Sequence, residues 1–266
     1  MGDVYTHGHH ESVLRSHTWR TAENSAAYLL GSLAPGQDLL DVGCGPGTIT
    51  ADLAARVAPG QAVGIDPSAE VVARAAELGR ASGAGNLRFA TGDVYRLAFD
   101  DGSFDVVHAH QVLQHLTRPV DALAEMRRVL RPGGVLAVRD SDYAAFAWAP
   151  DDPLLDRWLD LYDAVTRRNG AEPNAGRYLL GWARRAGFSD LVATSSTWTF
   201  ADPERRRWWG ELWADRVRYS AFADQALAYG LSDADELAAL AGAWRRWAAA
   251  PDGFFAVLHG EVLGRR

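Results

Sequence analysis

The sequence predicts an α/β protein with a doubly wound, seven-stranded, mainly parallel sheet. Short apolar runs alternate with segments of helical periodicity along the first half of the chain, which is typical of parallel strands wrapped by helices. A glycine-rich segment directly follows the first apolar run, where an open α/β sheet holds its ligand. At 266 residues, 48% of them hydrophobic, the chain is long enough for one such domain with a buried core.

The expected strands are short apolar runs that end in glycine or in a polar residue. They cover residues 38–43, 61–65, 86–91, 104–109, 135–139, 191–200 and 254–263. After the first strand, Ile49, Leu53 and Val57 share one helical face, and a helix that begins near Pro119 ends where Arg131-Pro132-Gly133-Gly134 interrupts it. Further helices are expected later in the chain, at about 153–168, 175–186 and 203–248.

Three parts are expected in the chain. One or two helices at about 10–31 lie outside the alternation, so residues 1–35 are expected to form a helical cap. Residues 36–200 and 252–266 form the core, and 201–251 form a helical lid, because so long an insertion between the last two strands needs a use. The alternative for this insertion is an apolar dimer interface, so the chain is expected to be a monomer or a homodimer.

Composition excludes several classes of protein. The net charge of −7 lacks the basic field that nucleic-acid binding requires, so no nucleic-acid partner is expected. No apolar run approaches the roughly 18 residues of a membrane span, and the start of the chain does not resemble a signal peptide, so a cytoplasmic location is expected. A single cysteine, Cys44, excludes an internal disulfide and a thiolate metal cluster. All 27 basic residues are arginine, as in proteins of GC-rich bacterial genomes.

Polar or glycine residues follow three successive strands of the expected sheet. Asp41-Val42-Gly43-Cys44-Gly45-Pro46-Gly47 closes the first strand and opens a helix, and glycines there let the backbone approach a ligand. Asp66 ends the second strand, where a carboxylate accepts hydrogen bonds from ribose hydroxyls, and Asp93 ends the third. Taken singly, the loop is also compatible with a tight turn, Asp66 with a helix cap and Asp93 with a turn closure. Together they indicate a bound nucleoside.

Four segments carry a family resemblance. They are DVGCGPG at 41–47, GIDPS at 64–68, TGDVYRLAFDDGSFDVVHAHQVLQHL at 91–116 and EMRRVLRPGGVLAV at 125–138. In this combination the chain resembles the class I S-adenosylmethionine-dependent methyltransferases, which have a Rossmann-like fold, and in particular the small-molecule branch that includes the ubiquinone and menaquinone methyltransferases. The resemblance implies S-adenosyl-L-methionine as cofactor. It also implies that an N-terminal segment with Tyr5, Trp19 or Arg20 folds over that cofactor.

The resemblance further implies a role for each part of the site. The backbone of Gly43 to Gly45 would hold the methionine part, Asp66 the ribose, and Asp93 with Val94 the adenine. Arg20 would pair with the methionine carboxylate, and the alternative is a solvated arginine on a helix surface. His110 and Gln111 would lie beside the transferable methyl group. The full set of cofactor-binding residues implied in this way is Arg20, Asp41, Gly43, Cys44, Gly45, Asp66, Pro67, Gly92, Asp93, Val94, His110 and Gln111.

Other cofactors and acceptors fit the residues less well. The third glycine falls one position early for a dinucleotide-binding loop. His110-Gln111-Val112-Leu113 differs from the loop of enzymes that methylate adenine N6, and Cys44 is committed to the glycine loop instead of serving as the nucleophile of a cytosine-C5 enzyme. We therefore expect a small organic acceptor. The alternatives are a protein that holds the cofactor without methyl transfer, and methylation of a peptide or an RNA.

The acceptor's chemistry decides whether a base is needed. A hydroxyl acceptor must lose a proton, whereas an amine or a stabilised carbanion needs no base. The candidates are His110, His115, Asp140 and Asp142, which follow the fourth and fifth strands. A structural hydrogen bond is the alternative for His115, and a cap of the following segment is the alternative for Asp140 and Asp142. Four tryptophans, Trp198, Trp208, Trp209 and Trp213, could form an aromatic wall for the acceptor, and the alternative for each is a core-facing position. A metal site is not expected at the N-terminal histidines His7, His9 and His10, because no carboxylate or thiol partner is evident.

Overall fold

The computed structural model describes residues 3–7 and 16–266. Eight strands of this part of the chain form one sheet in the order β3-β2-β1-β4-β5-β8-β6, with β7 on the other edge of β8. The strands are β1 (Leu39–Val42), β2 (Ala62–Asp66), β3 (Leu87–Thr91), β4 (Phe104–His110), β5 (Leu130–Ser141), β6 (Ala147–Ala149), β7 (Ser189–Phe200) and β8 (Phe254–Arg265). Strands β1 to β5 are parallel, and β8 runs antiparallel to its neighbours.

The predicted fold class is confirmed, with one strand more than expected. All seven expected strands are present, and the additional β6 pairs with β8 next to the end of β5. Ser141 of β5 lies opposite His259, and Ala147 of β6 lies opposite Ala256. The strand β6 therefore prolongs the line of β5 along β8. Three residues are too few to give a periodic signal in the sequence.

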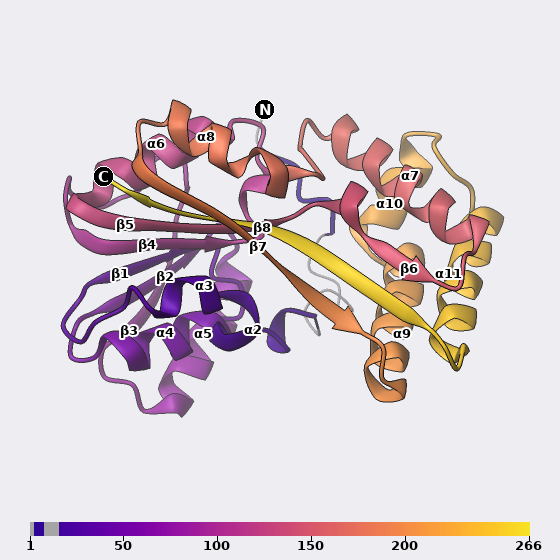
Figure 1. Cartoon of the computed structure of the whole chain (residues 1–266), viewed down its shortest axis with the longest axis horizontal. Coiled ribbons are helices and arrows are strands. Elements are labelled where there is room, and N and C mark those ends of the chain that lie inside the picture. The colour runs from indigo at the N-terminus through magenta and orange to yellow at the C-terminus, as the bar shows by residue number, and fades with distance from the viewer. Residues whose placement is uncertain (1–2, 8–15) are drawn as a thin grey trace.

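Helices cover both faces of the sheet, as Figure 1 shows. One face carries α2 (Ala22–Ser25), α3 (Ala27–Leu30), α4 (Thr48–Val57) and α5 (Ala69–Ser82), and the other carries α6 (Pro119–Val129) and α8 (Leu179–Arg185). Three short 3₁₀ turns connect elements: η1 (Leu113–His115), η2 (Tyr143–Ala145) and η3 (Ala175–Tyr178). The expected apolar face of α4, with Ile49, Leu53 and Val57, is buried. Leu130 begins β5 instead of ending the helix before it.

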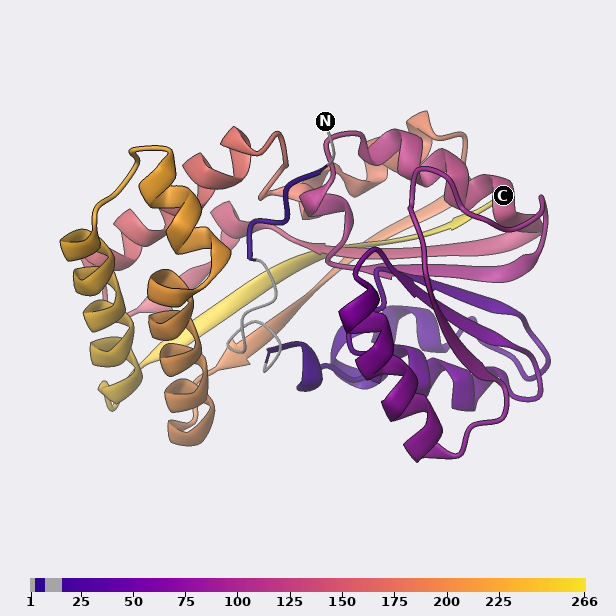
Figure 2. The same ribbon diagram turned by 180° about the vertical axis from the view of Figure 1, so that it is seen from behind.

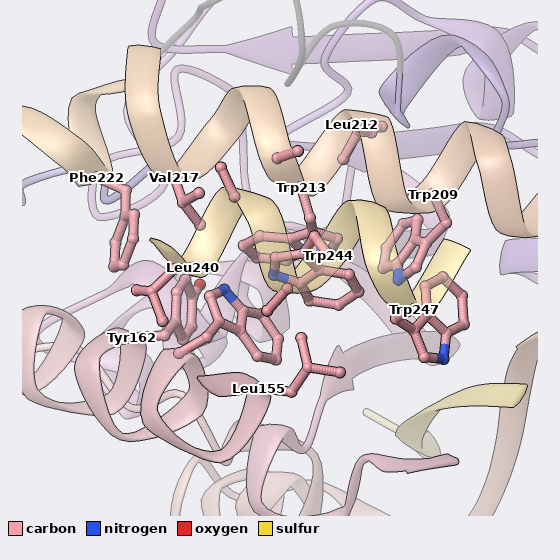
Figure 3. Close-up of a cluster of buried hydrophobic side chains, with 14 of the residues drawn as sticks. Leu155, Tyr162, Trp209, Leu212, Trp213, Val217, Phe222, Leu240, Trp244 and Trp247 are labelled. Carbon is pink, nitrogen blue, oxygen red and sulfur yellow. The ribbon is translucent and has the colours of Figure 1, made fainter. Parts of the chain in front are cut away.

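A second group of helices packs around the far ends of β7 and β8 and forms a separate lobe (Figures 1 and 2). It consists of α7 (Pro153–Arg168), α9 (Pro203–Tyr219), α10 (Ala221–Ala228) and α11 (Ala234–Ala249). Figure 3 shows its apolar centre, where Trp213 and Trp244 stack at 5.6 Å between their ring centroids. A Cβ on Gly210 of α9 would lie 2.6 Å from the Cβ of Ala248, so glycine permits the close approach of α9 and α11.

The lobe differs from the expected lid in two respects. The stretch expected to be helical over 203–248 is three helices, interrupted at Ser220 and again at Gly230, which has a φ of +66°. Helix α7 falls in the range expected for the core, yet Leu155, Trp158 and Tyr162 of α7 belong to the apolar centre of the lobe. The lobe is thus built from two separate parts of the chain.

The N-terminal segment lies between the core and the lobe, where Figure 2 shows residues 3–7 in indigo. Asp3 Oδ1 accepts hydrogen bonds from the backbone N–H (2.9 Å) and the hydroxyl (2.6 Å) of Thr117. Asn169 Nδ2 donates to the hydroxyl of Thr6 (3.0 Å). Residues 16–18 are helical. No helix in the described ranges is long and apolar enough to cross a membrane.

Candidate functional site

A cavity of about 450 Å³ opens between the core, the N-terminal segment and the lobe. Its floor is formed by the ends of β1, β2 and β4 and the loops that follow them. Its other walls come from residues 3–7, from residues 16–20 and from α9. Such a volume lies within the roughly 300–1,000 Å³ of small-molecule sites.

The glycine loop at the end of β1 has the backbone that its sequence predicts. Gly43 and Gly45 have φ angles of +68° and +55°, which favour glycine. A Cβ on Gly43 would lie 2.4 Å from Cγ2 of Val112, so the loop also packs too closely for any larger residue. Asp41 lines the cavity, but its carboxylate oxygens already contact the hydroxyl of Thr50 (2.6 Å) and Nδ1 of His108 (2.7 Å). Asp41 therefore connects β1 to α4 and to β4.

The two aspartates at the strand ends differ in their surroundings. Asp66 accepts from the backbone N–H of Gly45 (3.3 Å) and of Ser68 (2.9 Å), which holds its carboxylate beside the glycine loop. The cap of α5 is the side chain of Ser68, whose Oγ accepts from Val71. The helix-cap alternative for Asp66 is therefore wrong. Asp93 accepts from the N–H of Tyr95 (2.9 Å), so it does close a turn, and it also lines the cavity.

Gln111 and Arg20 join the end of β4 to the N-terminal segment. Gln111 has a φ of +54°, an uncommon conformation for a residue other than glycine. Its Oε1 accepts from Nη2 of Arg20 (2.5 Å), and its Nε2 donates to the hydroxyl of Ser141 (2.7 Å). Burial lowers the pKa of Arg20 to about 10, so this guanidinium remains charged at neutral pH. Arg20 is thus a cation in the lining of the cavity that also contains the glycine loop.

All twelve residues that the resemblance assigns to the cofactor line this one cavity: Arg20, Asp41, Gly43, Cys44, Gly45, Asp66, Pro67, Gly92, Asp93, Val94, His110 and Gln111. Cys44 is buried. Burial is the main cause that raises the pKa of its thiol, and the charges of Asp41 and Asp66 add to the rise. The thiol is therefore neutral and packs as an apolar group. The individual contacts of these residues with a cofactor stay predictions.

The four base candidates divide into two pairs. His110 and His115 line the cavity, whereas Asp140 and Asp142 are absent from its lining. Asp140 is 0% exposed and accepts from the N–H of Gln114 (3.1 Å), and burial raises its pKa to about 8. Both oxygens of Asp142 accept from Arg177, each at 2.5 Å. The structure thus gives both aspartates hydrogen-bond partners of their own, and the base role of all four residues stays a prediction.

The comparisons with known proteins identify the family. Residues 40–138 match the family described as methyltransferase domain. The chain is 34% identical to an uncharacterized methyltransferase of Schizosaccharomyces pombe, over 98% of this chain and 96% of that protein. The chain belongs to the class I S-adenosylmethionine-dependent methyltransferases. This methyltransferase is also 32% identical to a probable methyltransferase of Aspergillus luteorubrus, over 97% of this chain and 96% of that one.

A solved structure supports the fold of the methyltransferase. Phosphoethanolamine N-methyltransferase 2 of Haemonchus contortus, in complex with phosphomonomethylethanolamine and S-adenosylhomocysteine, has a TM-score of 0.60 and 17% identity, covering 97% of this chain and 58% of that chain. S-adenosylmethionine is the cofactor of this family. The described residues fit it, because the glycine backbone, the Asp66 carboxylate and the Arg20 cation offer partners for its amino-acid, ribose and carboxylate groups.

Aromatic residues of β7, η2 and α9 line the cavity of the methyltransferase, although one of the four expected tryptophans does not. Trp198, Trp209 and Trp213 line the cavity, with Tyr143, Phe146 and Arg216. Trp208 does not line the cavity. Its ring packs against that of Trp19, with 5.5 Å between the two ring centroids. Trp19 lies outside the lining too, whereas Tyr5 belongs to it.

Sequence reasoning missed the place of His7. Its Nε2 lies 3.0 Å from the Tyr162 hydroxyl and 3.5 Å from the Tyr143 hydroxyl, and its side chain lines the cavity. His9 and His10 lie outside the described residues. Within the described ranges, no group of three or more metal-ligating side chains is found. Only the clustering of histidines near the N-terminus marked this segment in the sequence.

Proposed function

We propose that this methyltransferase methylates a small organic acceptor bound in the same cavity as the cofactor. The observation that carries the proposal is that the residues assigned to the cofactor line one continuous space with aromatic side chains, among them Trp209 and Trp213 of the lobe. Trp209 and Trp213 come from α9, more than 140 residues after the glycine loop in the chain, and they face the same volume. A site of this shape favours an acceptor with an apolar or aromatic body.

The cofactor supplies a methyl group activated by a sulfonium charge. The chain's own contribution is alignment for an in-line displacement, which contributes roughly 7–11 kcal/mol in favourable cases. Buried rings such as Trp213 and Tyr143 exclude water from the space around the acceptor. These walls favour a small acceptor over a peptide or an RNA, which needs an open groove, and the net charge of −7 also weighs against RNA.

A product assay tests the proposal. The protein is incubated with S-adenosylmethionine carrying a labelled methyl group and with a fractionated extract of small organic molecules, followed by a panel of aromatic and aliphatic hydroxyl, amine and thiol compounds. We expect label in a small organic product and one S-adenosylhomocysteine per methyl group transferred. Asp66→Ala serves as the control variant with weakened cofactor binding. Label that appears only in protein or RNA, or not at all, would contradict the proposal.

A further inference from the structure

Gln111 keeps a side chain at a position where the backbone favours glycine. Its φ of +54° lies in the left-handed region, and within the described ranges Asp190 is the only other non-glycine residue with a positive φ. The backbone N–H of Gln111 donates to the carbonyl of Arg139 (2.7 Å), which holds the end of β4 against β5. Strain of this kind persists where the surrounding contacts impose it, and it is found at functional sites. The contacts of the Gln111 side chain therefore indicate what it does.

The Gln111 amide joins the N-terminal segment to two strands of the sheet. Its Oε1 accepts from Nη2 of Arg20 (2.5 Å), and because a guanidinium only donates, this contact identifies the amide oxygen. Its Nε2 then donates to the hydroxyl of Ser141 on β5 (2.7 Å) and to Nε2 of His259 on β8 (2.9 Å). Ser141 and His259 are at most 1% exposed. Both hydrogens of the amide are thus used inside the core, which fixes the direction of the oxygen.

The turn that carries Arg20 lies against the glycine loop. The backbone N–H of Arg20 donates to the carbonyl of His17 (3.2 Å), and the same carbonyl accepts from the hydroxyl of Thr48 at the start of α4 (3.3 Å). A Cβ on Gly45 would lie 3.7 Å from Nδ1 of His17. The turn is therefore packed on the loop whose backbone the family resemblance assigns to the methionine part of the cofactor.

Two contacts hold the guanidinium of Arg20. Its Cζ lies 5.6 Å from the centroid of the Trp198 ring, within the range of a cation–π interaction, and the hydrogen bond to Gln111 fixes its orientation over that ring. In the part of the chain that the structure describes, this guanidinium forms no ion pair with a carboxylate. A guanidinium has five N–H donors, of which Gln111 takes one. A cation that lines the cavity in this state favours an anionic group of the ligand.

We propose that Gln111 is a positioning residue for the cofactor, because it holds Arg20 in the orientation in which the guanidinium binds the carboxylate of the methionine part. The side chain of arginine is long and flexible, and its affinity for a ligand increases when it is fixed before the ligand binds. Glycine at position 111 would relieve the backbone strain, but it would leave Arg20 without this acceptor. The inference concerns the cofactor alone and does not depend on the identity of the acceptor.

Two ligands separate the positioning of Arg20 from general support of the site. S-adenosylhomocysteine carries the amino-acid group, whereas 5′-methylthioadenosine has the same adenosine and sulfur without that group. Titration calorimetry on the full chain measures both affinities for wild type, Arg20→Ala and Gln111→Ala. We expect both variants to bind S-adenosylhomocysteine roughly 5- to 150-fold more weakly and 5′-methylthioadenosine within about twofold of wild type. Equal losses for the two ligands, or unchanged binding of S-adenosylhomocysteine by Gln111→Ala, would overturn the proposal.

A double variant tests whether Gln111 acts through Arg20. Once Arg20 is removed, the loss of Gln111 should matter little, so Arg20→Ala/Gln111→Ala should bind S-adenosylhomocysteine within about twofold of Arg20→Ala. If the two single losses instead multiply in the double variant, Gln111 contributes independently of Arg20 and the proposal is wrong.

Gln111→Gly and Asp190→Ala separate the side chain from the backbone. Gln111→Gly relieves the left-handed strain, so its free energy of unfolding should exceed that of Gln111→Ala, while its affinity for S-adenosylhomocysteine should be equally low. Asp190 has a φ of +47° and lies outside the cavity lining, so Asp190→Ala should leave both affinities unchanged. A loss in Gln111→Ala that Gln111→Gly does not share would assign the effect to the backbone and overturn the proposal. None of these measurements uses an acceptor, so the product assay tests the proposed function separately.

Discussion

Replacing Gly43 by alanine tests how closely the glycine loop is built, and Gly83 offers a matched control. Both residues have nearly the same backbone conformation, with φ angles of +68° and +69°. A Cβ on Gly83 meets no atom within 4 Å, whereas a Cβ on Gly43 would lie 2.4 Å from Val112 Cγ2. Gly83→Ala therefore adds backbone strain alone, about 1–2 kcal/mol, and Gly43→Ala adds the same strain together with a steric overlap.

The loop of Gly43→Ala must shift to relieve this overlap, and the shift moves backbone groups away from the cofactor. The loss of one hydrogen bond at a buried site costs about 1–3 kcal/mol, which corresponds to a roughly 5- to 150-fold weaker affinity. Titration calorimetry with S-adenosylhomocysteine should show this loss for Gly43→Ala and an unchanged affinity for Gly83→Ala. Urea unfolding should show a lower free energy of unfolding for both.

A second substitution identifies the cause. Val112→Ala removes Cγ2, the atom that the new Cβ would meet, so the double variant Gly43→Ala/Val112→Ala should regain part of the lost affinity. Wild-type affinity in Gly43→Ala would refute the reasoning, because the loop would then tolerate a side chain where the structure leaves no room for one. Equal losses in Gly43→Ala and Gly83→Ala would refute it as well.

Three further predictions concern the cofactor, the buried carboxyl group and the aromatic wall. Asp66→Ala should weaken S-adenosylhomocysteine binding by about 1–3 kcal/mol in calorimetry, and unchanged binding by a folded variant would exclude the ribose role. Because burial raises the pKa of Asp140 from 3.8 to about 8, its neutral form adds stability that is complete below pH 3.8 and is lost as the pH rises through about 8. The free energy of unfolding of wild type and of Asp140→Asn is measured between pH 5 and pH 8. That of wild type should fall relative to that of the variant by at most about 1.4 kcal/mol per pH unit. Parallel plots of the two free energies against pH would argue against a raised pKa of Asp140. Trp209→Phe and Trp213→Phe should raise the KM of the acceptor, while the cofactor affinity stays within about twofold of wild type. Trp208 lies outside the cavity lining, so Trp208→Phe should leave both constants unchanged. Equal effects at all three positions would contradict the assignment of Trp209 and Trp213 to the aromatic wall.

The core of the fold was predictable because its signals are local. Each parallel strand is a short apolar run followed by a helix with one apolar face, and the residues that end β1, β2 and β3 are adjacent to those runs in the sequence. Parallel order brings their carboxyl ends to one edge. Asp66 and the glycine loop could therefore be placed together before any coordinates were known, and both line the cavity.

Contacts between distant segments were not predictable in the same way. Asp142 looked available as a base, but Arg177, 35 residues later, occupies its carboxylate. The range predicted for α7 matches the helix in the structure. Its periodicity, however, does not show whether the helix packs on the sheet or, as it does, with α9 and α11. In the sequence, His7 is distinguished only by the other histidines near it. Its tyrosine partners lie on η2 and α7, more than 130 residues away in the chain.

A crystal structure of the protein with S-adenosylhomocysteine tests the central claim most directly. The claim is that the core, the N-terminal segment and the lobe enclose one space for cofactor and acceptor. We predict that the adenosine lies between Asp66 and Asp93, with the sulfur directed toward the volume bounded by His7, Tyr143 and Trp213. A cofactor bound elsewhere, or a sulfur atom directed away from the lobe toward open solvent, would contradict it.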